Sequence, residues 1–294
     1  MGMPLRHLPA LDAELATVPG TVSVWCGRLG RPAAYARLPD VAHYAASTMK
    51  VAVLAAVYRA AETGRLDLDA PVEVRNEFPS AAPGAPPFGC ERGYDNDEAV
   101  WQRLGGRAPL RWLARRMIVR SSNLATNICL TSVGLDAVAE VWRRAGAGNS
   151  AVGRCIEDAA ASEAGITNQV TAADLAALLG AVAGRATGPD AITGPDAVAG
   201  PASCREMTEV LLAQEHLDDL AAGLPPGVPV AHKNGWVRGV RHGAGVVYPA
   251  DTPPYAIVCC TTTPLATNDA GDEACRLVAR VAAASWADRH ALAG

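Results

Sequence analysis

Near the two ends of the chain, apolar residues alternate with polar ones or form short unbroken runs, which is the pattern of β-strands. These runs are rich in Val, Thr, Tyr and Cys, and Gly- or Pro-containing turns separate them. The pattern predicts two strands near the start and three near the end, at Thr21–Arg28, Ala33–Arg37, Val228–Trp236, Gly243–Tyr248 and Tyr255–Thr262.

Between the two strand regions, apolar residues recur every three or four positions, the period of a helix with a buried face. One helix is expected to begin at Ser47 and to stop at Gly64. The same period predicts further helices at 110–119, 122–131, 135–145, 171–182 and about 202–222, and flanking helices at 8–18 and 272–289. The Pro- and Gly-rich segments Pro79–Tyr94 and Gly188–Pro201 are expected to be loops.

This order of strands, a long helical block and strands again predicts an α+β fold. The simplest packing joins residues 1–45 and 223–294 in one sheet domain and makes residues 46–222 a helical domain. A crevice between two such domains is a usual place for a small-molecule site.

Composition narrows the classes of function. The chain has 294 residues, a net charge of -4 and 50% hydrophobic residues, so it offers no basic surface for nucleic acid. No apolar run reaches the length of a membrane span, and Asp12 and Glu14 interrupt the region where a secretory signal would lie. We therefore expect no nucleic-acid or membrane partner and a cytoplasmic location, although a processed secreted form would look the same.

The eight cysteines are scattered and form no CxxC pair, so neither a metal site nor a disulfide framework is indicated. We expect no metal and no cofactor. The lysines are more informative, because only two, Lys50 and Lys233, occur among 26 Lys and Arg residues. A buried Lys can lose its proton and act as a base, whereas Arg stays charged.

Both lysines lie in short motifs. Ser47-Thr48-Met49-Lys50 opens a predicted helix, which puts Lys50 one turn from Ser47 on the same helix face. A hydroxyl at a helix N-terminus with a desolvated amine beside it is one way to make a serine nucleophilic. Taken alone, the motif is also a common helix cap.

The other two motifs are Ser121-Ser122-Asn123, at the start of a second predicted helix, and Lys233-Asn234-Gly235, followed by Trp236 in a predicted strand. Each is weak in isolation, since Ser and Asn are ordinary cap residues. The first and second motifs begin predicted helices, and the third lies in a predicted strand. This order and these positions together make the set of three motifs a specific signal.

With these motifs, the chain resembles the class A β-lactamases and the penicillin-binding D-alanyl-D-alanine peptidases, whose motifs are S-x-x-K, S-D-N and K-T-G. The likeness runs from about Ala45 to Thr262 and includes ASTMKVAVLAAV, RSSNLATN and LPPGVPVAHKNGW. It implies a β-lactamase/transpeptidase-like fold, an antiparallel sheet with flanking terminal helices plus an inserted all-helical domain, with the site in the crevice.

The resemblance also implies roles for the residues at the matching positions. Ser47 would be the acylated nucleophile, Lys50 its base, and Ser121 a proton relay to the leaving nitrogen. Asn123 and Lys233 would bind the substrate's amide and carboxylate, with Asn234 and Gly235 completing that strand. The backbone N–H groups of Ser47 and Trp236 would form the oxyanion hole.

Three positions depart from the family pattern. Ser122 replaces the Asp of S-D-N, so another group must fill its structural role. Asn234 replaces the Thr of K-T-G, which puts recognition of a substrate carboxylate in doubt. Glu157 is the best match to the Glu that activates the deacylating water, yet its spacing from Arg154 is one residue too long. Glu157 is equally a candidate surface carboxylate or a partner for Arg154.

Beyond the third motif, Arg241 is a candidate for binding an anionic substrate group, because a guanidinium suits carboxylates. A solvated hairpin tip is the alternative for this segment.

The sequence therefore predicts a serine hydrolase or acyltransferase acting on a small-molecule acyl donor, an amide, lactam or ester. Water would resolve the acyl-Ser47 intermediate if Glu157 positions it, and an amine acceptor would do so in an amide-forming transacylase of specialised metabolism. Other readings are a penicillin-binding sensor module without turnover and a β-lactamase-like glutaminase.

Overall fold

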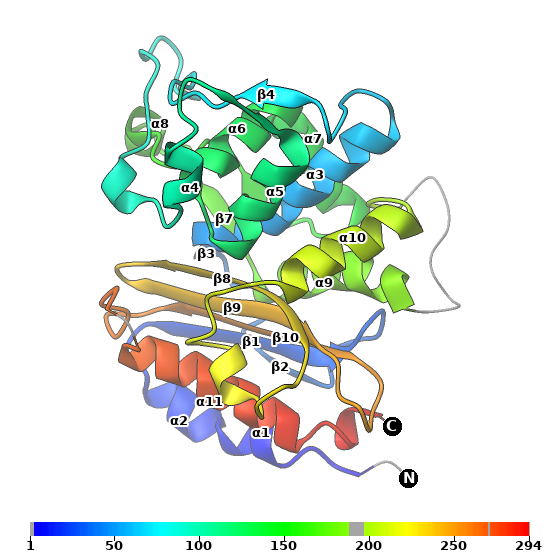
Figure 1. Ribbon diagram of the computed structural model, residues 1–294. Coiled ribbons are helices and arrows are strands. Elements are labelled where there is room, and N and C mark those ends of the chain that lie inside the picture. Colours follow the sequence, from blue (N-terminus) through cyan, green and yellow to red (C-terminus); the bar gives the residue numbers. More distant parts are fainter. Residues whose placement is uncertain (1–2, 188–196, 270, 294) are drawn as a thin grey trace.

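The computed structural model describes residues 3–187, 197–269 and 271–293. Its centre is a five-stranded antiparallel sheet in the order β2-β1-β10-β9-β8, drawn across the middle of Figure 1. The strands are β1 (Thr21–Arg28), β2 (Tyr35–Arg37), β8 (Val230–Val237), β9 (Val240–Val247) and β10 (Tyr255–Thr262). Strands from both ends of the chain thus share one sheet.

Helices cover both faces of this sheet. On one face lie α11 (Glu273–Ala287), α1 (His7–Ala10) and α2 (Asp12–Thr17), and on the other lie α9 (Ala172–Thr187) and α10 (Pro201–Leu212) (Figure 1). Val24 and Ile257 belong to the core under the terminal helices, whereas Ala244 and Val258 belong to the core under the helical layer. Burial on both faces explains why the strands read as near-continuous apolar runs.

The helical layer is built around α3 (Lys50–Glu62), in which every residue from Lys50 to Tyr58 is buried. Helices α5 (Leu110–Val119), α6 (Asn123–Val133), α7 (Leu135–Arg144), α9 and α10 pack against it. Two short helices, α4 (Glu98–Trp101) and α8 (Ala159–Glu163), lie in the connecting segments. Because α3 is apolar on all sides, it needs this complete enclosure by other elements.

The α+β fold class and the antiparallel sheet with an inserted helical layer are confirmed. Most predicted elements correspond to observed ones, but the helix expected over 8–18 is divided at Leu11 into α1 and α2. The helix expected over about 202–222 ends at Leu212. The Gln214 side chain accepts the N–H groups of Glu215 and His216 and donates to Ile118 O, so the chain turns away from the helix axis. Most of the predicted loop 188–201 lies outside the described residues.

The structure also contains short strands that the sequence pattern did not predict. They are β3 (His43–Tyr44), β7 (Asn168–Val170) and β6 (Ala151–Val152) in one small sheet, and β4 (Pro71–Glu73) with β5 (Arg107–Pro109) in another. β3 leads directly into the first motif. The domain boundaries proposed from the sequence stay a prediction.

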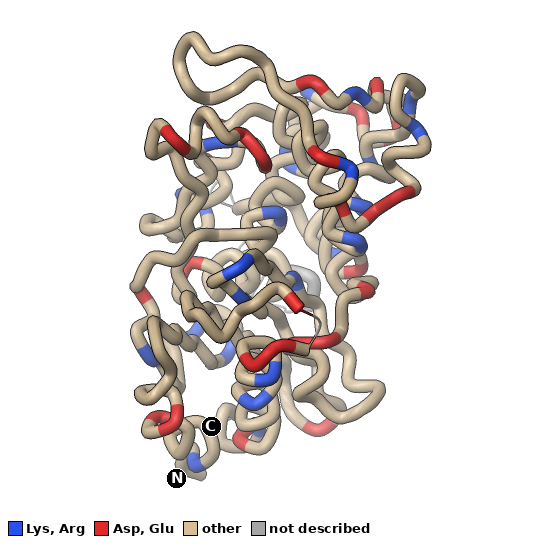
Figure 2. Tube along the Cα trace, turned by 90° about the vertical axis from the view of Figure 1, so that its left-hand side faces the viewer, with Lys and Arg blue, Asp and Glu red and all other residues tan. Residues whose placement is uncertain are grey.

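Charged residues of both signs are spread over both layers, as Figure 2 shows. Within the described ranges, no single helix is long and apolar enough to cross a membrane; α6 and α7 pass that test only together, as a pair bent by 87°. All eight cysteines are buried, and none of them forms a disulfide.

Asp288 joins the two ends of the chain. This buried residue at the end of α11 accepts the backbone N–H groups of Arg6, His7 and Leu8 at distances of 2.8–3.1 Å. These N–H groups open α1 and have no acceptor within the helix. The carboxylate therefore caps α1 and fixes it below the sheet.

We expect Asp288→Ala to lower the free energy of unfolding by about 2–3 kcal/mol, because it leaves buried N–H groups without a charged acceptor. Chemical denaturation followed by circular dichroism measures the change. Asp251→Ala is the control, since Asp251 forms exposed ion pairs with Arg289 and His290. An equal effect of both substitutions would contradict the capping role.

Candidate active site

The chain presents Ser47 at a sharp turn between β3 and α3. Ala46 has a φ of 45°, in the left-handed region, and Ala46–Met49 form a 3-10 helix that continues into α3. Ser47 is partly exposed, whereas Lys50 is fully buried. Because Ser47 lies in the first turn, its own N–H has no acceptor within the helix.

Lys50 points from α3 to the start of α6. Its Nζ donates to Ser121 O at 2.7 Å, to Ser121 Oγ at 3.2 Å and to Asn123 Oδ1 at 3.0 Å. These three acceptors are uncharged, and burial lowers the pKa of Lys50 to about 7. Lys50 is therefore available as a base near neutral pH.

The helical spacing led us to expect a hydrogen bond between Lys50 and Ser47. In this conformation the two side chains do not form one. The three donor positions of Lys50 are all engaged by the second motif. The first and second motifs thus meet through the amine, while the Ser47 hydroxyl makes no hydrogen bond in the part of the chain described.

Ser121 is shaped for this contact by its backbone. It is fully buried and has a φ of 59°, which turns both its carbonyl and its hydroxyl toward Lys50. The next residue, Ser122, is the N-cap of α6, and its Oγ accepts the N–H of Ala125 at 3.1 Å.

Asp95 fills the structural role left open by Ser122. Its Oδ2 accepts Ser122 Oγ at 3.0 Å and the N–H of Leu124 at 2.8 Å, so a carboxylate still lies at the N-terminus of α6. Asp95 could not be predicted from the sequence, because it comes from a loop that no pattern connects to the motif.

Strand β8 brings the third motif beside Ser47. A Cβ placed on Gly235 would lie 2.9 Å from Ser47 N and 3.1 Å from Thr48 N, closer than a side chain permits. Only glycine lets the strand approach the first turn of the helix this closely.

The adjacent Trp236 supplies a second free donor. Val237 and Val240 pair across the two-residue turn of the β8–β9 hairpin, and a pair so close to the turn must be a hydrogen-bonded one. In an antiparallel ladder the neighbouring Trp236 then directs its N–H away from β9, toward the open edge of the sheet. The N–H groups of Ser47 and Trp236 are therefore the candidate donors of an oxyanion hole.

Lys233 and Asn234 are fully buried on the same strand. Lys233 Nζ donates to Asn234 O at 2.9 Å and to Asn234 Oδ1 at 3.1 Å. Burial and the nearby Lys50 hold the pKa of Lys233 well below its usual value. On the open side, the Trp236 ring meets the His216 ring edge-on at 5.0 Å, a contact that the sequence did not suggest.

Glu157 reaches the site from the segment before α8. It has a φ of 68°, its Oε1 accepts Asn123 Nδ2 at 3.1 Å, and its Oε2 accepts the N–H of Glu91 at 2.7 Å. Arg154 does not pair with it and instead donates to Ile166 O, Cys155 O and two hydroxyls.

Asn127 holds this segment in place. Its Nδ2 donates to Ile156 O at 2.9 Å, and its Oδ1 accepts the N–H of Ile156 at 2.8 Å. The predicted loop 79–94 also lines the site, through Glu91 and through Tyr94, whose carbonyl accepts Asn123 Nδ2 at 3.3 Å. A continuous line of hydrogen bonds therefore runs from Ser121 through Lys50 and Asn123 to Glu157.

Arg241 is the predicted site residue that the structure does not bring into this cluster. It is 3% exposed, and its guanidinium lies 3.6 Å from Asp272 and 3.9 Å from Asp218, beside the Trp236 ring. A substrate anion cannot reach it in this conformation. The paired acids were not visible in the sequence because they lie in distant segments.

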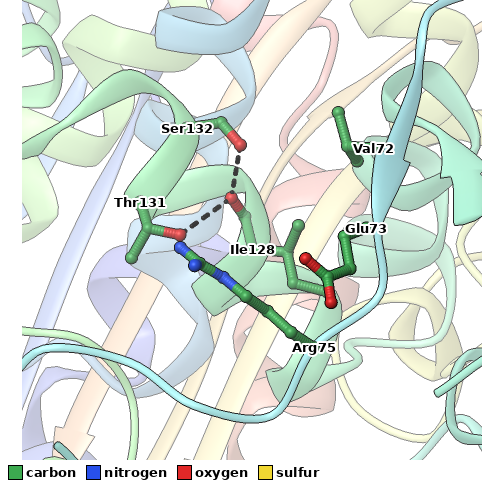
Figure 3. A pocket seen from close by; sticks show the side chains of 6 residues that line it. All are labelled: Val72, Glu73, Arg75, Ile128, Thr131 and Ser132. Carbon is green, nitrogen blue, oxygen red and sulfur yellow. Dashed lines mark hydrogen bonds between the residues drawn. The ribbon is translucent and has the colours of Figure 1, made fainter. Parts of the chain in front are cut away.

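A separate hollow of about 210 Å³ lies at the other end of α6, between Thr131, Ser132 and the strand residues Val72 and Glu73 (Figure 3). Eight residues of helix separate Thr131 from Asn123, a rise of about 12 Å. The Thr131 and Ser132 hydroxyls both donate to Ile128 O, so they serve the helix and not the hydrogen-bonded cluster.

Comparisons with known proteins agree with this geometry. The model of the family described as "Beta-lactamase enzyme family" matches residues 9–286. No curated protein matches the chain.

Several solved structures share the fold. A mutant of PBP-A in an acyl-enzyme complex with penicillin G is 21% identical over 97% of this chain and 98% of its own, with a TM-score of 0.73. A β-lactamase from Sphaerobacter thermophilus is 22% identical over 97% of both chains, with a TM-score of 0.74. A reconstructed ancestral class A β-lactamase is 20% identical over 96% and 99%, with a TM-score of 0.75.

We expect Gly235→Ala to slow acylation of Ser47 by about 10²–10³-fold, the usual loss when one oxyanion donor is displaced. The new methyl group would push β8 away from Ser47 N. Stopped-flow or mass-spectrometric acylation rates measure the effect. The control is Gly148→Ala, because Gly148 has open space around it and no left-handed backbone. An unchanged rate in a folded Gly235→Ala protein would remove the proposed oxyanion hole.

We expect the acylation rate of Ser47 to rise with pH and to level off above about 7, because only neutral Lys50 can accept a proton. Below that pH the amine is protonated and the base is lost. Lys50→Arg, which stays charged, should abolish acylation at every pH tested. A rate that falls with rising pH through this range would exclude Lys50 as the base.

Proposed function

The chain belongs to the β-lactamase enzyme family, and on that premise we propose that it hydrolyses a lactam, or a related amide or ester, through an acyl-Ser47 intermediate. A serine hydrolase of this type needs a nucleophile, a neutral base, an oxyanion hole and a way to activate water. Each requirement has a candidate among the residues that meet in the crevice.

Acylation begins with attack of Ser47 Oγ on the substrate carbonyl carbon while its proton passes to Lys50 Nζ. The negative charge on the carbonyl oxygen is stabilised by the N–H groups of Ser47 and Trp236. The carbon–nitrogen bond then breaks, and the proton moves from Lys50 through Ser121 Oγ to the leaving nitrogen. The 3.2 Å hydrogen bond from Lys50 Nζ to Ser121 Oγ supports this route.

Deacylation requires a water molecule and a base on the other side of the ester. Glu157 accepts a proton from water as the oxygen of that water attacks the acyl carbon. The ester bond to Ser47 Oγ then breaks, and the Ser47 oxygen takes up the proton held by Glu157, which returns Glu157 to its carboxylate and leaves Lys50 neutral. The hydrogen bonds that join Lys50, Asn123 and Glu157 are the one observation that carries this proposal.

The position of Glu157 favours water over an amine as the acyl acceptor. A transacylase would need a base or a binding site for the amine, and among the described residues the only carboxylate that hydrogen-bonds to Asn123 is that of Glu157. A non-turnover sensor would have no use for such a group. The cytoplasmic location stays a prediction.

We expect Glu157→Gln to acylate at a near-normal rate and to deacylate about 10²–10⁴-fold more slowly, the range for loss of a general base. The acyl adduct on Ser47 would then persist, as intact-mass spectrometry with penicillin G would show. Wild type should release its adduct as the hydrolysed acid.

The matched control is Glu91→Gln, because Glu91 contacts Glu157 through its backbone N–H and keeps that contact after substitution. Ser47→Ala should give no adduct. An adduct that persists for hours on wild type would favour the sensor. Normal turnover by Glu157→Gln would exclude Glu157 as the base, and release of the acyl group only on addition of an amine would favour the transacylase.

A further inference from the structure

The two polar residues of the third motif are used inside the protein. Lys233 and Asn234 are both 0% exposed, and the lysine directs Nζ to the carbonyl and side-chain oxygens of Asn234. The Asn234 side chain therefore does not offer its oxygen to a ligand, and its amide nitrogen faces into the protein.

The segment that carries Asp219 lies beside Asn234, because a Cβ placed on Gly243, the β9 partner of Asn234, would lie 3.0 Å from the Cβ of Leu220. Asp219 is fully buried in the segment after α10, where its Oδ1 accepts the N–H of Leu220 at 2.6 Å. Its Oδ2 and the Nδ2 of Asn234 have no hydrogen bond in the part of the chain described, yet they are close enough for Asn234 to lower the pKa of the Asp219 carboxyl. Burial outweighs this effect and raises that pKa to about 6.

Asn234 thus stands between a buried amine and a buried carboxyl. Asp219 raises the pKa of Lys233, against the lowering by burial and by Lys50, so the two groups interact across the amide. An ionised Lys233–Asp219 pair carries no net charge, and the positive potential that a free lysine would lend to the crevice is cancelled at short range.

Two other positively charged or titratable groups, which lie beside the Trp236 ring, are also unavailable to an anion. Arg241 is buried beside Asp218 and Asp272. His216 has its Nε2 3.2 Å from Arg120 O; a carbonyl can only accept, so this nitrogen carries the proton. Burial lowers the pKa of His216, which leaves the ring neutral and its Nδ1 an acceptor.

We propose that Asn234 and Asp219 are positioning residues that neutralise Lys233, so that the site takes acyl donors that are uncharged at the end facing β8. The substrate class is then a neutral lactam, amide or ester, in place of one that carries a carboxylate next to the scissile bond. This inference rests on the proposed acyl-Ser47 chemistry and sets its specificity.

The test compares two acyl donors that differ only in this charge, penicillin G and its methyl ester. Intact-mass spectrometry follows the rate at which each forms an adduct on Ser47 at neutral pH. For wild type we expect a free-acid to ester rate ratio at or below one.

Two variants should raise this ratio by about tenfold, a usual effect of one added or removed charge near a bound ion. Asn234→Thr would release Lys233 and shorten the side chain, and Asp219→Asn would remove the opposing carboxylate. Glu209→Gln is the matched control, because it makes the same change of charge at an exposed residue of α10, the helix packed against β8. It should change the ratio by much less.

A wild-type preference for the free acid of tenfold or more would overturn the inference. So would variants that lose both rates in parallel, since that result indicates a structural role alone. Absence of an adduct with either compound on wild type would instead overturn the proposed function. The ratio and the adduct therefore report on separate claims.

Discussion

The structure depends on keeping one amine out of water. Lys50 is fully enclosed, and burial makes protonating it about 5 kcal/mol more costly than in solution, even though three uncharged oxygens accept hydrogen bonds from its Nζ. That cost is what would let the amine serve as the proposed base. Burial of Lys50 requires that its helix, α3, be enclosed on all sides. This enclosure in turn requires helices around α3 and a sheet beneath its first turn.

Backbone strain is concentrated where that enclosure meets the crevice. Ala46, Ser121 and Glu157 are three of the five non-glycine residues with positive φ in the described ranges, and each lies in or beside the hydrogen-bonded cluster. Such conformations cost about 1–3 kcal/mol each and persist only where the surrounding structure imposes them. Here the imposed turns direct a hydroxyl, a carbonyl and a carboxylate toward one small volume.

Sequence patterns predicted the groups whose spacing is local. Ser47 and Lys50 share a helix turn, and Gly235 precedes Trp236 on a strand, so short motifs fix their relation. The contacts that pattern could not supply are long-range. Asp95 reaches Ser122, Asp219 faces Asn234, and Arg241 is screened by acids from other segments. The prediction of one helix over 202–222 was wrong for the same reason, because the Gln214 side chain forms a long-range hydrogen bond to Ile118 O on α5.

These long-range contacts explain how the family motifs could change here. A serine in place of the usual Asp keeps a carboxylate at α6 because Asp95 supplies one from another loop. An asparagine in place of the usual Thr can bond to Lys233 from its own strand while its amide faces a buried acid. The first change preserves the local charge and the second cancels it. Substitutions at equivalent motif positions therefore have opposite consequences, and the partner outside the motif decides which one follows.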